Sequence, residues 1–361
     1  MGMGEQDTRY AKRGEVHLAY QVTGDGPVDV VMIPGFISHV ELRWREPALA
    51  RFLRQLGTFT RLIAFDKRGM GLSDRDPNER TPTLAQRVGD VSAVMDAAGC
   101  PRAALFAWSE GGATAIRFAL THPSRVAALI LVGTTPRFCL EPDFPEGIPL
   151  ELLTLAVQTW QRDWGTGVAL ALYGPSVVDD ARFASWWAGY QRHSASPGSM
   201  ASSLRMQWGV DVRTDLPHLT IPTLVLHRVD DMVIPVTCAR YMAANILGAH
   251  YREMPGSDHM YWLGDQIASI EYIREFLAGA IEGVSVKQRR RRTSTGWESL
   301  TPRELEVARS IGDGLTNKQI AERFWLSPRT IQSHVGNVLA KLDLANRSEI
   351  AAEAARRFPA P

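Results

Sequence analysis

The chain has 361 residues, of which 45% are apolar and 22% charged, a composition typical of a globular protein with room for one large and one small domain. No apolar run reaches the roughly 18–20 residues that span a bilayer, and the N-terminus lacks the apolar core of a signal peptide. Three cysteines without CxxC spacing exclude a disulfide framework and a structural zinc site. We therefore expect a reduced, cytoplasmic protein that contacts no membrane.

Charge is distributed unevenly along the chain. Residues 1–283 carry 26 Lys and Arg against 31 Asp and Glu, whereas residues 284–361 carry 14 against 8. Five of the later cations are Lys287 and the arginines at 289–292. An acidic body with a basic tail region predicts two domains, the second a candidate for nucleic-acid binding. The arginine run taken alone is equally consistent with a solvated linker.

Strand-like and helix-like segments alternate over residues 1–282. Several of the expected strands are continuous apolar runs, as in strands covered on both faces; they are 16–22, 28–33, 61–66, 102–107, 126–133, 222–227 and 249–254. The alternation predicts an α/β domain with a doubly wound, mostly parallel sheet. A further strand ahead of Gly14 would be joined there to the strand at 16–22, and this opening pair predicts an antiparallel hairpin at the edge of the sheet. Residues 136–212 are helix-like and rich in tryptophan, which is typical of a cap over a pocket.

A serine follows the expected strand at 102–107. Ser109 lies in Trp-Ser-Glu-Gly-Gly, ahead of a helical stretch, and fits the nucleophile elbow G-x-S-x-G with Ala107 in place of the first glycine. Such a turn lifts the hydroxyl out of the sheet and points the following backbone amides towards it. The context after a buried strand therefore makes Ser109 a candidate nucleophile.

An acid and a base follow later strands, in the order that such a serine requires. Asp230 and Asp231 come after the strand at 222–227, and His259 comes after the strand at 249–254. The carboxyl ends of parallel strands share one edge of the sheet, so these side chains should meet Ser109 there. Either aspartate could be the acid on this reasoning.

With these motifs, residues 8–282 resemble an α/β-hydrolase. The family's acid lies in a D-x-x-V/I-P stretch, which selects Asp231, four residues before Pro235. The resemblance also implies that the backbone amides of Phe36 and Glu110 form the oxyanion hole, although Pro-Gly-Phe replaces the usual H-G-x. It implies acyl transfer to water, with no cofactor and no metal, and it leaves the ester, lactone or other carbonyl substrate open.

The C-terminal part has the pattern of a small all-α domain. Residues 283–297 are polar, basic and without periodicity, which indicates a linker. Residues 298–361 contain four helix starts, at Thr301, Thr316, Ser327 and Asn346. The second and third helices nearly touch in sequence, which predicts a helix-turn-helix. The expected core is Ile320, Phe324, Leu326, Ile331, Val335, Val338, Leu339 and Leu342.

Residues 300–349 resemble a LuxR-type DNA-binding domain. In that family the third helix enters the major groove of operator DNA, and we expect a homodimer that reads two half-sites. The resemblance implies that the base-reading positions are Gln332, Ser333 and Gly336. Because Gly336 lacks a side chain, direct readout at that position is either lost or taken over by Asn337. Phosphate contacts are assigned to Lys318, Arg329, Thr330 and Lys341.

Together the two halves predict a bacterial transcription regulator with a hydrolase-fold sensor that binds and hydrolyses a small carbonyl compound. Two alternatives stay open. The pocket could be a receptor with an inactive triad, or the protein could be an esterase that uses its helical domain only to dimerise.

Overall fold

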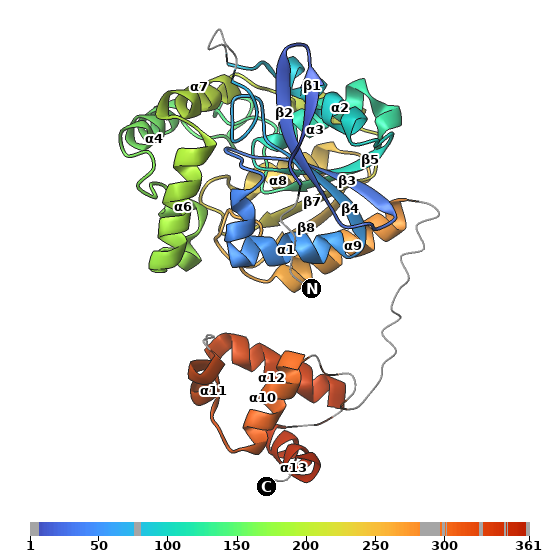
Figure 1. Ribbon diagram of the computed structural model, residues 1–361, viewed down its shortest axis with the longest axis vertical. Coiled ribbons are helices and arrows are strands. Elements are labelled where there is room, and N and C mark those ends of the chain that lie inside the picture. The colour runs from blue at the N-terminus through green and yellow to red at the C-terminus, as the bar shows by residue number, and fades with distance from the viewer. Residues whose placement is uncertain are drawn as a thin grey trace. The chain divides into compact units, whose positions relative to one another are not determined.

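A computed structural model describes residues 7–75, 81–281, 297, 300, 302–324, 328–342, 344 and 346–358. The chain divides into two compact units, Met1–Val284 and Ser285–Pro361 (Figure 1). The predicted linker at 283–297 lies outside the described residues apart from Trp297, so its extent stays a prediction. Among the helices of the described ranges, none is both long and apolar enough to cross a membrane.

Eight strands of the described part form one sheet in the larger unit, in the order β1-β2-β4-β3-β5-β6-β7-β8. Their bounds are β1 (Arg9–Arg13), β2 (Val16–Thr23), β3 (Val28–Ile33), β4 (Thr60–Phe65), β5 (Ala103–Trp108), β6 (Val126–Val132), β7 (Thr223–Arg228) and β8 (His250–Met254). β1 and β2 form the expected antiparallel hairpin, β2 runs antiparallel to β4, and the remaining neighbours are parallel. The predicted mostly parallel sheet is confirmed.

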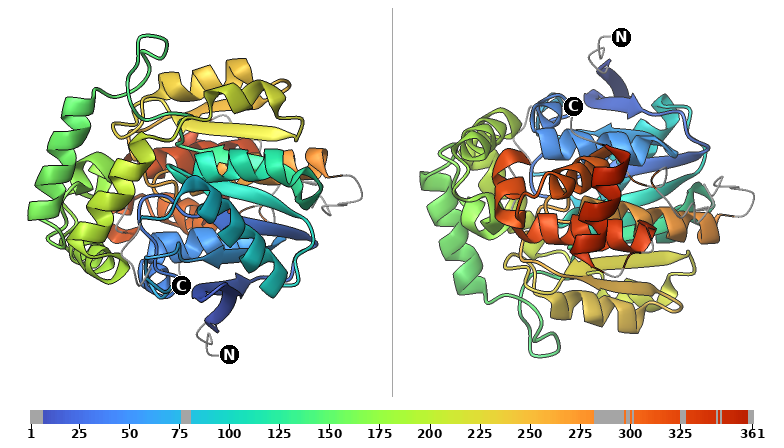
Figure 2. Two further views of the ribbon diagram at one scale, coloured as in Figure 1. Left: turned by 90° about the horizontal axis from the view of Figure 1, so that it is seen from above. Right: turned by 90° about the horizontal axis from the view of Figure 1, so that it is seen from below.

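Helices cover both faces of this sheet (Figure 2). One face packs on α1 (Pro47–Gly57) and α9 (Gln266–Ala280), and the other packs on α2 (Leu84–Ala97), α3 (Gly111–Thr121) and α8 (Val236–Asn245). Successive strand residues point to opposite faces, so Met32 joins the first core while Val31 joins the second. This double coverage explains why the strands read as continuous apolar runs.

A helical insertion separates β6 from β7, as the tryptophan-rich sequence predicts. It contains α4 (Leu150–Arg162), α5 (Leu170–Tyr173), α6 (Ala181–Ser194) and α7 (Pro197–Trp208), and α4, α6 and α7 lie together beside the sheet (Figure 1). Asp180 caps α6 and Ser196 caps α7 by accepting backbone N–H bonds. Trp187 is fully buried, and the other four tryptophans of the insertion are partly buried against the same core. Most of these side chains therefore serve packing.

The smaller unit is helical, with α10 (Pro302–Gly312), α11 (Asn317–Phe324), α12 (Pro328–Leu342) and α13 (Arg347–Arg357) in its described residues. The expected capping box at Thr316 is present, since its N–H donates to Gln319 Oε1 at 2.8 Å and the Gln319 N–H donates back to Thr316 Oγ1 at 3.3 Å. The predicted core residues Ile320, Ile331, Val335 and Val338 are buried; Phe324, Leu339 and Leu342 pack against them. Thr301 and Leu326 lie outside the described residues.

Candidate functional site

Ser109 lies in a tight turn between β5 and α3. Its φ of +55° is in the left-handed region that residues other than glycine rarely adopt. The turn fits because two glycines follow it. A Cβ on Gly111 would lie 2.7 Å from the Ile33 carbonyl oxygen, and one on Gly112 would lie 1.9 Å from Thr134 Oγ1. The strained serine and the two glycines therefore form a tight turn at the position where the sequence predicts a nucleophile.

The structure brings the three predicted triad residues together. His259 Nε2 lies 2.9 Å from Ser109 Oγ, and His259 Nδ1 lies 2.7 Å from Asp231 Oδ2. The other oxygen of Asp231 accepts N–H bonds from Val233 at 2.8 Å and from Ile234 at 3.1 Å. All three side chains are buried. The arrangement can therefore pass a proton from the hydroxyl to an imidazole that the carboxylate orients.

The surroundings of Asp231 favour its ionised form. Burial raises the pKa of Asp231, but its electrostatic interaction and hydrogen bond with the His259 ring outweigh burial and leave this pKa below its ordinary value. Asp230, by contrast, is exposed to solvent. The structure thus places Asp231 rather than its neighbour against the imidazole.

Sequence reasoning missed a second histidine beside the carboxylate. His227 in β7 is fully buried, with Nε2 at 2.8 Å from the Ile234 carbonyl oxygen and at 3.6 Å from Asp231 Oδ2. Burial lowers its pKa, which favours the neutral ring. Because a carbonyl oxygen can only accept, Nε2–H is the donor in this bond. The only indication in the sequence that His227 belongs to the site was its position four residues before Asp231.

Lys67, also missed, connects the two residues expected to form the oxyanion hole. Its Nζ donates to the Phe36 carbonyl oxygen at 2.9 Å and to the Glu110 carboxylate, which also accepts from Arg87 Nη1 at 3.0 Å. The backbone amides of Phe36 and Glu110 donate to no protein acceptor within the described ranges. Burial lowers the pKa of Lys67 to about 8, although the charge of Glu110 opposes this shift.

Aromatic rings from the helical insertion cover the triad. The Tyr173 ring lies 5.2 Å from the His259 ring, and the Phe36 ring lies 5.6 Å from Trp160 and 5.7 Å from Trp164. Ser109 is accordingly only 3% exposed. The hydroxyl is therefore shielded from solvent in this structure.

In the smaller unit, α12 carries most of the predicted DNA-contacting residues. Gln332, Gly336 and Asn337 are exposed on it, and Lys318 is exposed on α11. Lys341 instead donates to Glu304 Oε2 at 2.6 Å within the unit. The side chains of Arg329, Thr330 and Ser333 lie outside the described part, so their DNA contacts stay predictions.

Two further residues fix the position of Gln332. Asn317 Nδ2 donates to Gln332 Oε1 at 2.6 Å, and Arg347 Nη1 donates to Asn317 Oδ1 at 2.6 Å. Gln332 is exposed, and this chain of bonds engages the oxygen of its amide and not its side-chain NH₂ group. Sequence reasoning missed Asn317 and Arg347 because the bonds join three different helices.

Comparison with known protein families matches residues 30–268 to the alpha/beta hydrolase family and residues 298–354 to the luxR family of bacterial regulatory proteins. The pimeloyl-[acyl-carrier protein] methyl ester esterase of Nitrosomonas europaea is 28% identical over 257 residues, which cover 69% of this chain and 94% of that relative. The structure of an esterase from Exiguobacterium antarcticum shares the fold, with a TM-score of 0.64 and 22% identity over 74% of this chain and 98% of its own.

The smaller unit has a different relative. A Mycobacterium bovis protein named as an HTH-type transcriptional regulator is 49% identical over 80 residues, which cover 21% of this chain. The match spans only 9% of that regulator, so the likeness concerns the helical domain alone. The chain thus belongs to the alpha/beta hydrolase family and carries a C-terminal DNA-binding domain of the LuxR family.

Proposed function

We propose that the protein is a transcription regulator whose hydrolase domain cleaves a small carboxylic ester or lactone at Ser109. The bonded series Ser109–His259–Asp231, with distances of 2.9 and 2.7 Å, carries the proposal because it joins a nucleophile, a base and an ionised acid. The strained turn that presents Ser109 supports the same role.

The reaction proceeds in two stages. His259 Nε2 accepts the Ser109 proton as Oγ bonds to the carbonyl carbon, and the amides of Phe36 and Glu110 donate to the oxyanion that forms. The imidazolium then gives its proton to the leaving alkoxide oxygen. In the second stage His259 deprotonates a water that attacks the acyl-serine, which releases a carboxylic acid and restores the hydroxyl. Asp231 stays ionised throughout.

The surroundings favour an apolar acyl group. The Tyr173 ring packs on the rings of His259 and Phe36, and Trp160 and Trp164 pack on Phe36 in turn. Aromatic rings beside the triad exclude water from the reacting atoms. The methyl ester activity named for the Nitrosomonas relative supports an ester in particular.

For the helical domain we propose that α12 enters the major groove of operator DNA as part of a homodimer. A single module offers few base contacts, so a symmetric pair on two half-sites supplies the specificity. Of the exposed residues, Lys318 contacts a phosphate and Gln332 contacts a base edge.

One observation favours the receptor alternative as second candidate. Ser109 is 3% exposed, so a ligand enclosed by the aromatic rings could act by binding alone. The variant Ser109→Ala distinguishes hydrolysis of the ligand from binding of the ligand, because it removes the proposed nucleophile and leaves the rest of the site in place.

A fluorophosphonate and a panel of esters and lactones test the proposal on the wild-type protein and Ser109→Ala. The wild type should be labelled and active, and Ser109→Ala should lose labelling and up to roughly 10⁶-fold in kcat. Folded wild-type protein that resists labelling contradicts the enzyme. Operator affinity measured in parallel then shows whether regulation requires turnover or only binding.

A further inference from the structure

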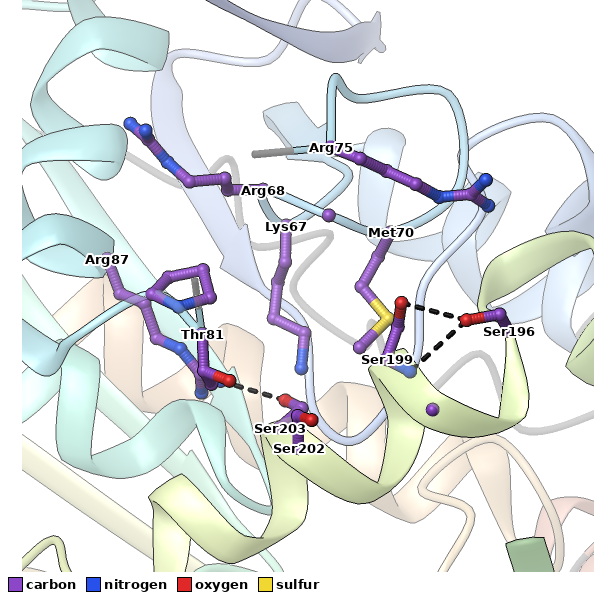
Figure 3. Close-up of a pocket in the computed structure, with 13 residues that line it drawn as sticks. Lys67, Arg68, Met70, Arg75, Thr81, Arg87, Ser196, Ser199, Ser202 and Ser203 are labelled. Atoms are coloured by element: carbon purple, nitrogen blue, oxygen red, sulfur yellow. Dashed lines mark hydrogen bonds between the residues drawn. The ribbon is translucent and has the colours of Figure 1, made fainter. Parts of the chain in front are cut away.

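A cavity of about 590 Å³ lies between the loop after β4 and the first half of α7 (Figure 3). Ser109 and His259 are not among its lining residues. The lining includes the cations Lys67, Arg68, Arg75 and Arg87 and the hydroxyl side chains of Thr81, Ser196, Ser199, Ser202 and Ser203. Within the described residues, no carboxylate lines it.

The charges in the wall of this cavity do not balance. Lys67 and Arg87 are 7% and 8% exposed, and both donate to one oxygen of Glu110, which is 2% exposed. One carboxylate therefore compensates two buried cations. Because an excess buried charge is costly in a medium of low dielectric, an anion close to this pair is stabilising.

The other groups at the cavity are donors suited to an oxyanion. Figure 3 shows Lys67 extending from its loop towards the hydroxyls of α7, with Arg75 on the other side of the opening near Ser196. Arg87 Nη2 donates to Ser203 Oγ at 2.9 Å, which keeps its guanidinium in the wall. The N-terminal end of α7, where backbone dipoles favour negative charge, lies at the same place.

We propose that this cavity binds the oxyanion end of a ligand, a carboxylate or a phosphate, at a site separate from the catalytic serine. Cationic side chains and N–H and O–H donors bind both groups by charge-assisted hydrogen bonds. The site needs no hydrolytic activity. Its occupant would lie one side chain away from Phe36, because Lys67 Nζ also donates to that backbone carbonyl.

Thermal unfolding of the full-length protein tests the site, with inorganic phosphate and malonate titrated in separate arms at constant ionic strength. A ligand that binds only the folded chain raises the melting temperature in a saturable way. We expect this rise in the wild type, and the arm with the lower saturating concentration identifies the preferred group.

Lys67→Met is the decisive variant. It leaves Arg87 and Glu110 as a balanced pair, so the chain should fold, while the lost charge-assisted bond should weaken binding by roughly tenfold or more. Arg51→Gln is the control, because it makes the same change in net charge at an exposed position of α1 outside the lining. Any phosphate bound by the helical domain affects all these proteins equally.

Ser202→Asp gives an independent test should Lys67→Met unfold. Ser202 is exposed in the lining, and a carboxylate there should repel the anion without disturbing the core. Equal, saturable responses in the wild type, Ser202→Asp and Arg51→Gln would overturn the proposal, as would a wild-type response that never saturates.

Discussion

Lys67 connects Phe36 and Glu110, two residues that are far apart in the sequence. Its ammonium holds the Phe36 carbonyl and the Glu110 carboxylate, and the amides of these same two residues are the proposed oxyanion donors. Holding the Phe36 carbonyl and the Glu110 side chain limits rotation about the backbone bonds at the Cα atoms of these two residues, and so restricts the directions of their amides. We therefore regard Lys67 as a positioning residue that does not touch substrate.

The lowered pKa of Lys67 gives this role a pH dependence. The folded chain releases the proton near pH 8 and the unfolded chain near 10.5, so this group alone makes the free energy of unfolding rise between these values. Hydrolysis should fall as the pH rises through about 8, where the folded chain loses this proton, since a neutral amine holds the Glu110 carboxylate less strongly. In kcat against pH, Lys67→Arg should lack the alkaline decrease while KM stays unchanged. A decrease that persists in Lys67→Arg contradicts the assignment.

The acid is tested by two neighbouring substitutions. Asp231→Asn keeps the shape of the side chain but loses the charge that favours the imidazolium and fixes its tautomer, and we expect kcat to fall by about 10⁴-fold. Asp230→Asn changes an exposed carboxylate and should leave kcat within about twofold. Steady-state kinetics on the two variants decide which aspartate is the acid. A larger loss of kcat in Asp230→Asn than in Asp231→Asn would assign the role to Asp230.

At the scale of elements, the turn from β5 to α3 depends on the absence of a side chain at Gly112. Gly112→Ala would place a methyl group 1.9 Å from Thr134 Oγ1 and should destabilise the fold by about 1–3 kcal/mol, with lower hydrolysis as Ser109 shifts. Gly189→Ala in α6 is the control, because its nearest neighbour is 3.9 Å away, and there the better helix propensity should stabilise by up to about 1 kcal/mol. Denaturant unfolding measures both.

Most of these elements could be predicted because their patterns are local. The expected strands agree with β2–β8 to within about a residue at most ends, since runs such as 126–133 are apolar only because both faces are covered. The meeting of Ser109, Asp231 and His259 was predictable because three strand ends share one sheet edge. The roles of three other residues could not be predicted, because each acts through contacts that only the packed chain creates; they are Lys67, His227 and Asn317. The choice of Asp231 over Asp230 required a family pattern.

At the scale of the whole molecule, DNA binding should separate two classes of residue. Gln332→Ala should cost about 1–3 kcal/mol at one base pair of the preferred operator and little elsewhere. Lys318→Ala should weaken binding on every sequence and make the slope of log K against log salt shallower by about one. Fluorescence anisotropy on duplexes with one and two half-sites measures both effects. Exchanged behaviour of Gln332 and Lys318 would mean that α12 docks in another register.

Asn317→Ala and Lys341→Ala extend this comparison. Asn317→Ala should reproduce part of the lost specificity, because it removes the bond that holds Gln332. Lys341→Ala should lower the melting temperature of the helical domain as well as its affinity for DNA, since it leaves the buried Glu304 without this cation.

The proposed triad is also spread widely along the chain, and this determines when the proposed hydrolytic activity can arise during synthesis. Ser109 and His259 are 150 residues apart, and the base follows β8, the last strand of the described sheet. A domain that folds as it leaves the ribosome would present its serine long before the imidazole arrives. The nascent chain would therefore have no esterase activity until almost the whole hydrolase domain had left the ribosome. A fragment that ends before residue 250 would fold its first strands but would not cleave an ester, because it lacks His259.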